Sequence, residues 1–522
     1  MTTRPSPDPF IQIAMNGNKS LVDEHSEKTF FKTIWEPCLS LTDSEDRQSR
    51  IVHQGLTAHE TSEALSSAGK INQDGHNLDV FIFESPRKTA QLAQFADALA
   101  CQLQDRSFKT KKIEWDSDFD MMDIEGKQCV FLLDYSAPLL ADLDEHGFHL
   151  LKQVVLTASE IVWACPSNHA ETGLIRGFSR VIRNEVPGLR FVTVATESPL
   201  PATYIETART IASLVNSKTS DAEFTIQDGA IRVPRIYEDT ALNEAMTNTS
   251  RHVELSHDRT YLLAGGLGGV GRSLSRLLVA RGARNLCFLS RSGVCSPGAT
   301  ALVTELESQG VSIQVIPADI GDLQSCKSAL ELCHERMPPL AGVIHAGMVL
   351  RDVLWKKMTF QQWRESLNPK VSGTRNLDEL LPKALDFFII LSSCFGIFGV
   401  RGQANYASAC AYQDEVAWAR HRAGRKATSL DLGMIADVGV LAENPVPKPV
   451  RAWMDVYGIP EDNLHLIIEF VIQCQLSEDW YKYPPQMITG LATGDKAYTS
   501  GVSPSYLKDA PFSQLARRSG IL

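Results

Sequence analysis

The sequence predicts an α/β protein built from two halves of similar layout, each with a parallel sheet covered by helices. Apolar runs of strand length alternate with longer runs of helical periodicity, beginning at residue 78. A second series of the same kind begins at Tyr261 and continues to about residue 434. Such alternation is typical of parallel sheets with helices on their faces.

The first half is expected to start with a strand at residues 30–37, after a polar, proline-containing tail over residues 1–28. Strand-like and helix-like runs then alternate at residues 80–83, 89–103, 129–134, 149–156 and 161–164. Residues 222–235 have the pattern of a hairpin closed by an Asp-Gly turn. Residues 84–87 (E-S-P-R) follow the first strand of the series and contain no glycine that would let a pyrophosphate approach. We therefore predict a structural role for this half and no cofactor site.

The second half opens with the most informative stretch of the chain, T-Y-L-L-A-G-G-L-G-G-V-G at residues 260–271. A short apolar strand runs into a glycine-rich turn, and a helical pattern and another buried strand follow. In a G-x-G-x-x-G turn, one glycine makes the tight turn, one lets the pyrophosphate approach, and one lets helix and strand pack closely. The free N–H groups and positive dipole of the helix then bind the phosphates. The glycines expected along a dinucleotide in this Rossmann-like half are Gly265, Gly266, Gly268, Gly269 and Gly271.

Ser290-Arg291-Ser292 stands at the end of the next strand, where a carboxylate would bind the ribose 2′-hydroxyl of NAD. Arg291 lies twenty positions beyond Gly271, so a cation and two hydroxyls are expected at the 2′ position of the ribose. These groups suit the additional phosphate of NADPH. A solvated loop arginine is the alternative. Asp319 follows the strand at residues 311–317, and its carboxylate can hydrogen-bond the adenine amino group or stand exposed without a ligand.

Length and composition limit the classes of partner. With 522 residues, two or three domains are expected. The net charge of −11 is spread along the chain, which argues against nucleic acid and anionic membranes as partners. No apolar run approaches the ~20 residues of a membrane helix, and residues 1–18 have no apolar signal core, so a cytoplasmic protein is expected. The 11 cysteines are scattered without metal-ligand spacing, which predicts no metal site.

Three polar side chains of the second half have a spacing that suggests chemistry. Ser393 ends the apolar strand that begins at Phe387, and Tyr406 opens a long helix thirteen positions later. Lys370 lies upstream, on a helix expected to cross the same sheet edge. Any one of these residues alone would be read as core edge or surface, but together after a nucleotide motif they predict a catalytic set.

Residues of about 260 to 440 resemble the ketoreductase domain of type I polyketide synthases, a branch of the short-chain dehydrogenase/reductase fold. The motifs that resemble the fungal highly reducing class are G-V-I-H-A-G-M-V-L-R-D at 342–352, L-D-F-F at 385–388, G-Q-A-N-Y at 402–406 and Y-Q-D at 412–414. The similarity extends back to Trp35, because these ketoreductases carry a structural subdomain, a truncated Rossmann half without cofactor, ahead of the catalytic one.

The resemblance implies a role for each member of the catalytic set. Tyr406 would protonate the carbonyl oxygen as hydride arrives from NADPH, and Ser393 would hydrogen-bond the substrate carbonyl. Lys370 would stabilise the phenolate and bind the nicotinamide ribose, because a phenol with a pKa near ~10 transfers a proton poorly at neutral pH. His345 and Ala346 are expected along the cofactor.

Cys410 is a departure from the family pattern, which has an asparagine four residues after the tyrosine. A thiol is a weaker hydrogen-bonding group than a carboxamide, so a water relay to Tyr406 would be less well held. A harmless variant is the favoured interpretation, and reduced activity is the alternative.

Two positions bear on the configuration of the product. The family's D-hydroxyl class carries an aspartate in a Leu-Asp-Asp-like loop, and this chain keeps the last one as Asp352 in Leu350-Arg351-Asp352. Phe398 stands where the other class has a tryptophan. The sequence therefore favours the D-hydroxyl class, although Asp352 could equally be a helix N-terminal residue that the dipole favours.

The expected organisation has four parts: a flexible tail (1–28), a structural subdomain (29–255), a catalytic NADPH-binding subdomain (256–483) and a C-terminal connector (484–522). By resemblance, the segment after Gly433 is a lid over nicotinamide and substrate, and a plain surface loop is the alternative. The implied activity is NADPH-dependent reduction of a β-ketoacyl thioester on the phosphopantetheine arm of an acyl carrier protein. The alternatives are a reductase of free small ketones or quinones, and a catalytically silent scaffold that retains the nucleotide fold.

Overall fold

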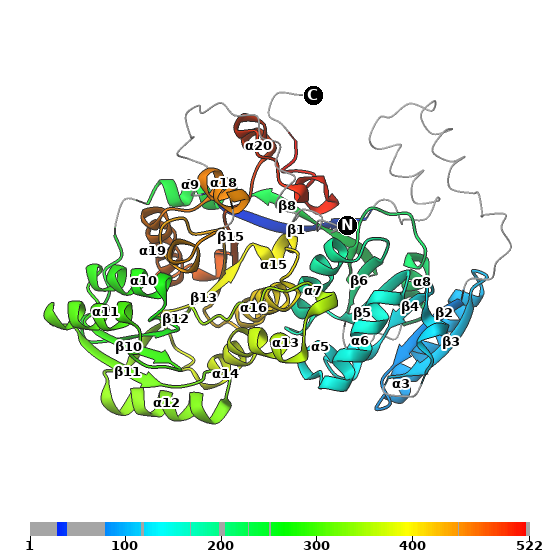
Figure 1. Ribbon diagram of the computed structural model, residues 1–522, viewed down its shortest axis with the longest axis horizontal. Helices are drawn as coiled ribbons and strands as arrows, with labels where there is room; N and C mark the ends of the chain where they lie inside the picture. The colour runs from blue at the N-terminus through cyan, green and yellow to red at the C-terminus, as the bar shows by residue number, and fades with distance from the viewer. Residues whose placement is uncertain are drawn as a thin grey trace, which may run out of the picture.

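The computed structural model describes residues 29–38, 79–115, 119–167, 169–197, 204–227, 229–249, 252–446 and 448–517. The tail expected at residues 1–28 lies outside this part of the chain. Figure 1 shows two α/β lobes side by side, the first half in blue and cyan and the second in green and yellow. The predicted α/β class with two Rossmann-like halves is confirmed.

The described strands form one continuous sheet of fifteen, in the order β11-β10-β9-β12-β13-β14-β15-β1-β8-β7-β6-β5-β4-β2-β3. The strands on either side of the centre are parallel within their own half, and the joints β15–β1, β1–β8 and β8–β7 are antiparallel. In the second half two strands, β10 and β11, lie between its first strand β9 and the edge of the sheet. Within the described residues, the first half has only β3 between β2 and the opposite edge. The first half is thus the truncated one.

The strands are β1 (Phe31–Pro37), β2 (Asp79–Glu84), β3 (Lys109–Glu114), β4 (Gln128–Phe131), β5 (Glu160–Pro166), β6 (Arg190–Thr196), β7 (Glu223–Gln227), β8 (Ala230–Glu238), β9 (Thr260–Ala264), β10 (Asn285–Ser290), β11 (Ser312–Pro317), β12 (Leu340–His345), β13 (Phe387–Ser393), β14 (Thr428–Leu432) and β15 (Gln486–Ile488).

The helices are α3 (Ala90–Gln104), α4 (Met121–Ile124), α5 (Leu139–Asp142), α6 (Glu145–Thr157), α7 (Thr172–Glu185), α8 (Tyr204–Leu214), α9 (Thr240–Thr247), α10 (Gly269–Ala280), α11 (Pro297–Ser308), α12 (Leu323–Arg336), α13 (Phe360–Leu367), α14 (Gly373–Leu380), α15 (Phe395–Phe398), α16 (Ala404–Arg422), α17 (Val440–Glu443), α18 (Lys448–Tyr457), α19 (Glu461–Leu476) and α20 (Gly494–Ser500). A π-helical turn, η6 (Asn368–Ser372), joins α13 to α14. Local sequence explains several starts, since side chains such as Thr89 and Ser296 accept hydrogen bonds from the first free N–H groups.

The two faces of the sheet are covered differently. On one face a single apolar core runs beneath both halves and includes residues of α6, α7, α13 and α16. On the other face α10, α11 and α19 cover the second half, while α3 and α8 cover the first half as a separate core. The halves are therefore joined through one face of the sheet as well as through its strands.

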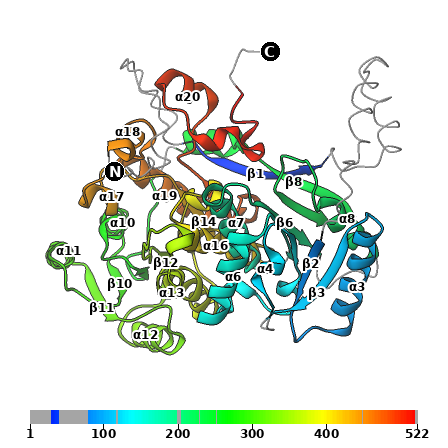
Figure 2. The same ribbon diagram turned by 45° about the vertical axis from the view of Figure 1, so that its right-hand side comes forward.

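The closest contact between the halves is the packing of α7 against α16, which lie side by side in both views (Figures 1 and 2). Gly173 and Gly177 allow this approach, because a Cβ on either would lie 2.2 Å from a carbonyl oxygen of α16, that of Ala411 or of Ala407. Small residues on both helices thus bring the two backbones together, as in other close helix pairs.

Three segments differ from the sequence-based expectation. β3 was missed because the run K-T-K-K-I-E is an exposed edge strand with charged side chains, which hides its periodicity. Residues 240–247, for which no element was predicted, form α9, whose Leu242 packs into the core of the second half. The connector expected at residues 484–522 is wrong, because β15 enters the sheet between β14 and β1, and Tyr506 and Phe512 are buried in an apolar cluster.

Candidate active site

A cavity of about 550 Å³ lies at the carboxyl ends of the strands of the second half. Its walls come from the turns after β9, β10, β11, β12 and β14 and from the end of β13. This is the edge where open parallel sheets bind ligands, since the strand order reverses next to β9. The lining includes Gly268, Arg291, Asp319, Ser393 and Tyr406. The residues expected along the dinucleotide and those expected to be catalytic therefore face one cavity.

The glycines of the turn after β9 have different steric surroundings. A Cβ on Gly271 would lie 2.4 Å from the Cα of Gly266, so these two serve the packing of helix against strand. Gly265 has a φ of +78° and faces Gly347 so closely that a Cβ would lie 2.8 Å from its Cα. A Cβ on Gly268 would meet only the carbonyl oxygen of Gly265, at 3.5 Å. Gly268 therefore leaves open space at the N-terminus of α10, where a phosphate can reach free N–H groups.

Gly269 faces a different neighbour. A Cβ there would lie 2.5 Å from the Cα of Gly439, in the segment expected to form the lid. Glu443, at the end of α17 in the same segment, accepts a hydrogen bond from Arg272 at 2.6 Å. The segment that contains Gly439 and α17 thus contacts the start of α10.

The residues expected near the adenosine also line the cavity. Ser290 is the last residue of β10 and Arg291 follows it, with an exposed side chain. Asp319 follows β11, and its carboxylate accepts hydrogen bonds from Gly321 N at 2.9 Å and from the Asn368 amide at 3.2 Å. Asn368 itself lines the cavity and was not predicted from the sequence.

Ser393 and Tyr406 meet at the other end of the cavity. Ser393 is the last residue of β13, and its hydroxyl accepts a hydrogen bond from Phe395 N at 3.3 Å. Tyr406 lies in the first turn of α16, and its hydroxyl is 4.0 Å from the sulfur of Met348. Burial raises the pKa of Tyr406 well above its usual range, and its hydrogen bond with Ser393 only partly opposes that rise. The phenol is therefore held in its protonated form.

Lys370 lies behind Tyr406 and does not line the cavity directly. The π-helical turn η6 brings its side chain inward, where it is 1% exposed. Its ammonium group donates to the carbonyl oxygen of Leu391 and to Oε1 of Gln413, both at 2.8 Å. The same nitrogen is 5.2 Å from the ring centroid of Tyr406, so a cation stands beside the phenol.

Cys410 is fully buried one turn beyond Tyr406 on α16. Burial raises the pKa of its thiol to about 11, and the charge of Lys370 opposes that rise. The thiol is accordingly neutral and is a neighbour of both Tyr406 and Lys370.

His345 and Ala346 differ in position. Ala346 lines the cavity, whereas His345 is fully buried beneath it. The Nδ1 atom of His345 accepts from Gly347 N at 3.3 Å, so Nε2 carries the proton and donates to the carbonyl oxygen of Pro369 at 3.0 Å. Burial lowers the pKa of this imidazole to about 3, so it is neutral. His345 thus supports the turn that carries Lys370.

Sequence reasoning missed two polar partners of the site. Gln413 fixes Lys370, and its amide also donates to Thr374 at 3.0 Å. Its position seven residues after Tyr406, on the same face of a helix, was a usable signal. Gln403 lines the cavity and donates to Asp352 at 3.0 Å, which fixes the aspartate expected to bear on product configuration.

Within the described part of the chain, no helix has the length and apolar character needed to cross a bilayer. Over the same residues, no group of three or more His, Cys, Asp or Glu side chains is arranged to hold a metal ion.

Comparison with known proteins places this geometry in a family. Residues 259–437 match the KR domain family, and residues 82–237 match the HRPKS sdrA-like, NAD(P)-binding Rossmann-fold domain. A highly reducing polyketide synthase of Cryptosporiopsis sp. (strain 8999) is 48% identical over 268 residues, which cover 51% of this chain and 11% of that protein. A highly reducing polyketide synthase of Didymella fabae is 45% identical over 263 residues, 50% of this chain and 14% of that protein.

Solved structures share the fold over nearly the whole chain. An A1-type ketoreductase superimposes with a TM-score of 0.68 at 18% identity and covers 94% of this chain and 100% of its own. The first ketoreductase of the tylosin polyketide synthase gives 0.66 at 17% identity, with coverage of 94% and 99%. The chain spans little more than a tenth of the curated synthases that it matches. The chain therefore carries a KR domain at residues 259–437, preceded at residues 82–237 by a Rossmann-fold domain that matches the HRPKS sdrA-like family.

Proposed function

We propose that this chain binds NADPH and reduces a β-ketoacyl thioester to the β-hydroxyacyl thioester. The observation that carries the proposal is the arrangement around one cavity, with Ser393 and Tyr406 at one end and the open Gly268 turn and Arg291 at the other. Lys370 stands 5.2 Å from the Tyr406 ring, which completes the arrangement.

The cavity suits a phosphorylated dinucleotide. The space left at Gly268 admits a pyrophosphate to the N-terminus of α10. Arg291 and Asp319 would hold the adenosine end of the dinucleotide. The guanidinium of Arg291 is a suitable partner for a ribose 2′-phosphate, which favours NADPH over NADH. When bound, the reduced nicotinamide supplies the hydride of the reaction.

The protein's own contribution is to bind and polarise the ketone and to deliver a proton. The hydroxyls of Ser393 and Tyr406 donate hydrogen bonds to the carbonyl oxygen, which stabilises the negative charge that develops there. Tyr406 then passes its proton to that oxygen, because burial keeps the phenol protonated until a stronger base forms beside it. The Lys370 ammonium, 5.2 Å from the ring centroid of Tyr406, stabilises the resulting phenolate.

The substrate class is proposed from the relatives. Highly reducing polyketide synthases are large multidomain proteins, and the thioester would reach this cavity on the phosphopantetheine arm of an acyl carrier protein. Asp352 lines the cavity beside Gln403, whereas Phe398 stacks on Tyr506 at 4.5 Å between centroids. These positions support the D-hydroxyl product class.

The first half would serve as support. After β2 the chain turns through residues 85–88 without glycine, and the cavity just described is lined only by residues of the second half. We infer one nicotinamide per chain, although the family model that matches residues 82–237 is described as NAD(P)-binding.

The direct test measures NADPH oxidation by the purified chain with a β-ketoacyl-N-acetylcysteamine thioester. Tyr406→Phe should reduce kcat by at least about a hundredfold while NADPH still binds, because only the proton donor is removed. Tyr412→Phe is the matched control, since Tyr412 lies on the same helix, packs in the core and does not line the cavity.

Three outcomes distinguish the alternatives. Equal turnover of carrier-free ketones or quinones and of thioesters would favour a general ketone reductase. NADPH binding without oxidation by any thioester would favour a silent scaffold. Unchanged turnover in Tyr406→Phe would remove Tyr406 from the mechanism.

A further inference from the structure

Two loops form the substrate side of the cavity. The first, residues 346–359 between β12 and α13, contributes Met348 and Asp352 to its lining. The second, residues 394–403 between β13 and α16, contributes Phe395 and Gln403 and connects Ser393 to Tyr406. We call them the β12 loop and the β13 loop.

A single carboxylate of the first half binds both loops. Glu185 is the last residue of α7, and its Oε1 accepts a hydrogen bond from Gly402 N of the β13 loop at 2.5 Å. Its Oε2 accepts one from Trp355 N of the β12 loop, also at 2.5 Å. Hydrogen bonds from backbone N–H groups to a carboxylate are among the stronger ones in proteins. Glu185 therefore fixes the distance between the two loops.

The loops also bind each other at the point that Glu185 holds. Val353 N donates to the carbonyl oxygen of Gly402 at 2.8 Å, and Gln403 donates to Asp352 at 3.0 Å. The second bond joins two cavity-lining side chains directly. Displacement of either loop would thus change the lining next to Tyr406.

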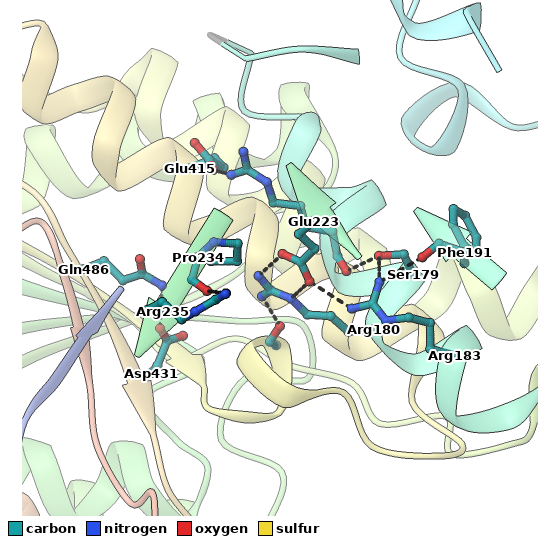
Figure 3. A network of polar contacts seen from close by, with 12 residues as sticks. Ser179, Arg180, Arg183, Phe191, Glu223, Pro234, Arg235, Glu415, Asp431 and Gln486 are labelled. Carbon is teal, nitrogen blue, oxygen red and sulfur yellow. Dashed lines mark hydrogen bonds and ion pairs between the residues drawn. The ribbon is translucent and has the colours of Figure 1, made fainter. Parts of the chain in front are cut away.

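Other residues of α7 hold the β13 loop along its length. Arg180 donates to the carbonyl oxygen of Gly396 at 2.7 Å, and Asn184 donates to that of Gly399 at 3.1 Å. Arg180 is itself fixed by Glu223, which accepts from its Nε and Nη2 at 2.8 and 2.7 Å (Figure 3). Together with Glu185, α7 contacts this loop at every third residue.

We propose that Glu185 is a positioning residue of the reduction, which sets the relative position of the two substrate-side loops and thereby the face of the ketone that receives hydride. Glu185 does not line the cavity. It acts through Gly402 and Trp355 on loops that carry Asp352, Gln403 and Phe395. The inference rests on the proposed ketoreductase function and assigns to the first half a share in specificity.

The test compares Glu185→Gln and Glu185→Ala with the unchanged chain, using NADPH and a β-ketoacyl-N-acetylcysteamine thioester. The alanine variant loses both acceptors, and the glutamine variant keeps one and turns an N–H group towards the other donor. We expect a graded loss in kcat/KM, about tenfold or more for alanine, because small misplacements of a substrate are costly. Chiral chromatography should show a mixture of hydroxyl configurations, with the NADPH dissociation constant unchanged.

Glu415→Gln is the matched control. Glu415 forms an ion pair with Arg176 between the same two helices, α16 and α7, and contacts neither loop. It should lower thermal stability without changing the product configuration. If the Glu185 variants give the same single configuration and the same kcat/KM as the unchanged chain, Glu185 has only a structural role and the inference is overturned.

The two proposals fail in different ways. If the unchanged chain reduces no β-keto thioester, the proposed function fails. If it does reduce one and the alanine variant is insoluble, the glutamine variant decides, since NADPH binding reports whether it has folded.

Discussion

The two halves of the sheet share a layout but use their glycines for opposite purposes. In the second half Gly268 leaves space at the start of α10, where a Cβ would meet one atom at 3.5 Å. In the first half Gly173 and Gly177 face another helix at close range. A Cβ on either would lie 2.2 Å from a carbonyl oxygen of α16. The same residue type thus admits a ligand in one half and a neighbouring backbone in the other.

Two buried carboxylates, Glu223 of the first half and Asp414 of the second, lie in opposite electrostatic environments. Glu223 of the first half is buried between arginines, and Arg180 and Arg183 more than offset burial, so its pKa falls to about 2. Asp414 of the second half is buried near Asp431, and burial raises its pKa to about 6. Ion pairs thus stabilise the charge of Glu223, whereas burial suppresses the charge of Asp414.

The largest expected effect is in the second half. Lys370→Met should lower kcat roughly a thousandfold, because the phenolate of Tyr406 loses the cation 5.2 Å from its ring. Steady-state NADPH oxidation measures this change. Lys327→Met, at an exposed position on α12, is the control and should leave kcat unchanged. Similar activity of the two variants would contradict the role of Lys370.

The next effect is in the first half and depends on pH. The folded pKa of Glu223, about 2, lies below its ordinary value of 4.5, so its ionised form stabilises the fold above pH 4.5 and that contribution is lost as pH falls towards 2. Glu223→Gln should therefore lower the free energy of unfolding by about 3 kcal/mol at pH 7. Denaturant unfolding should show the difference shrinking below pH 4.5.

Asp414→Asn provides the contrast. The folded pKa of Asp414 is raised from 3.8 to about 6, so ionisation opposes folding and stability falls as pH rises through this window. The asparagine variant should gain stability relative to the unchanged chain at pH 8 and gain none at pH 4. A parallel pH dependence of the two variants would refute the comparison of the halves.

A smaller effect distinguishes the two kinds of glycine. Gly177→Ala should lower the free energy of unfolding by about 2 kcal/mol, since α7 and α16 must move apart. Gly268→Ala should leave thermal unfolding unchanged but weaken NADPH binding. Thermal scans and cofactor titrations of both variants measure these effects, and destabilisation by Gly268→Ala would count against an open turn.

The smallest effect concerns cofactor choice. Arg291→Ala should weaken NADPH binding about tenfold and NADH binding little, because only NADPH carries a phosphate for the guanidinium. Arg87→Ala, in the glycine-free turn of the first half, should change neither affinity. Equal losses for both nicotinamides in Arg291→Ala would argue against the proposed contact.

The sequence predicted the features that depend on local pattern. The strand and glycine turn at residues 260–271 and the helix that begins near Tyr406 are visible because their periodicity and spacing are local. Lys370 was singled out by its position and given its role by the family resemblance, and the structure adds that a π-helical turn brings it inward. Roles within the site remain predictions.

What the sequence could not predict depends on contacts between distant segments. β15 has three residues, too few for any periodicity, and becomes a strand because β14 and β1 flank it. Glu185 lies at the end of an amphipathic helix, where an acidic residue is commonplace. It connects the two loops only because the fold places Gly402 N and Trp355 N within hydrogen-bond distance of its carboxylate. Neither the strand β15 nor the role of Glu185 can be recognised from the local sequence.

The pairing of Phe31 with Ile488 has a consequence for biosynthesis. The sheet cannot close across its centre until Ile488 has left the ribosome, because β15 is needed to connect β14 to β1. Contacts of such long sequence separation form slowly. Each lobe would therefore emerge and collapse with an unpaired central edge, so β1 and β14 are the strands on which a nascent-chain chaperone would be expected to act.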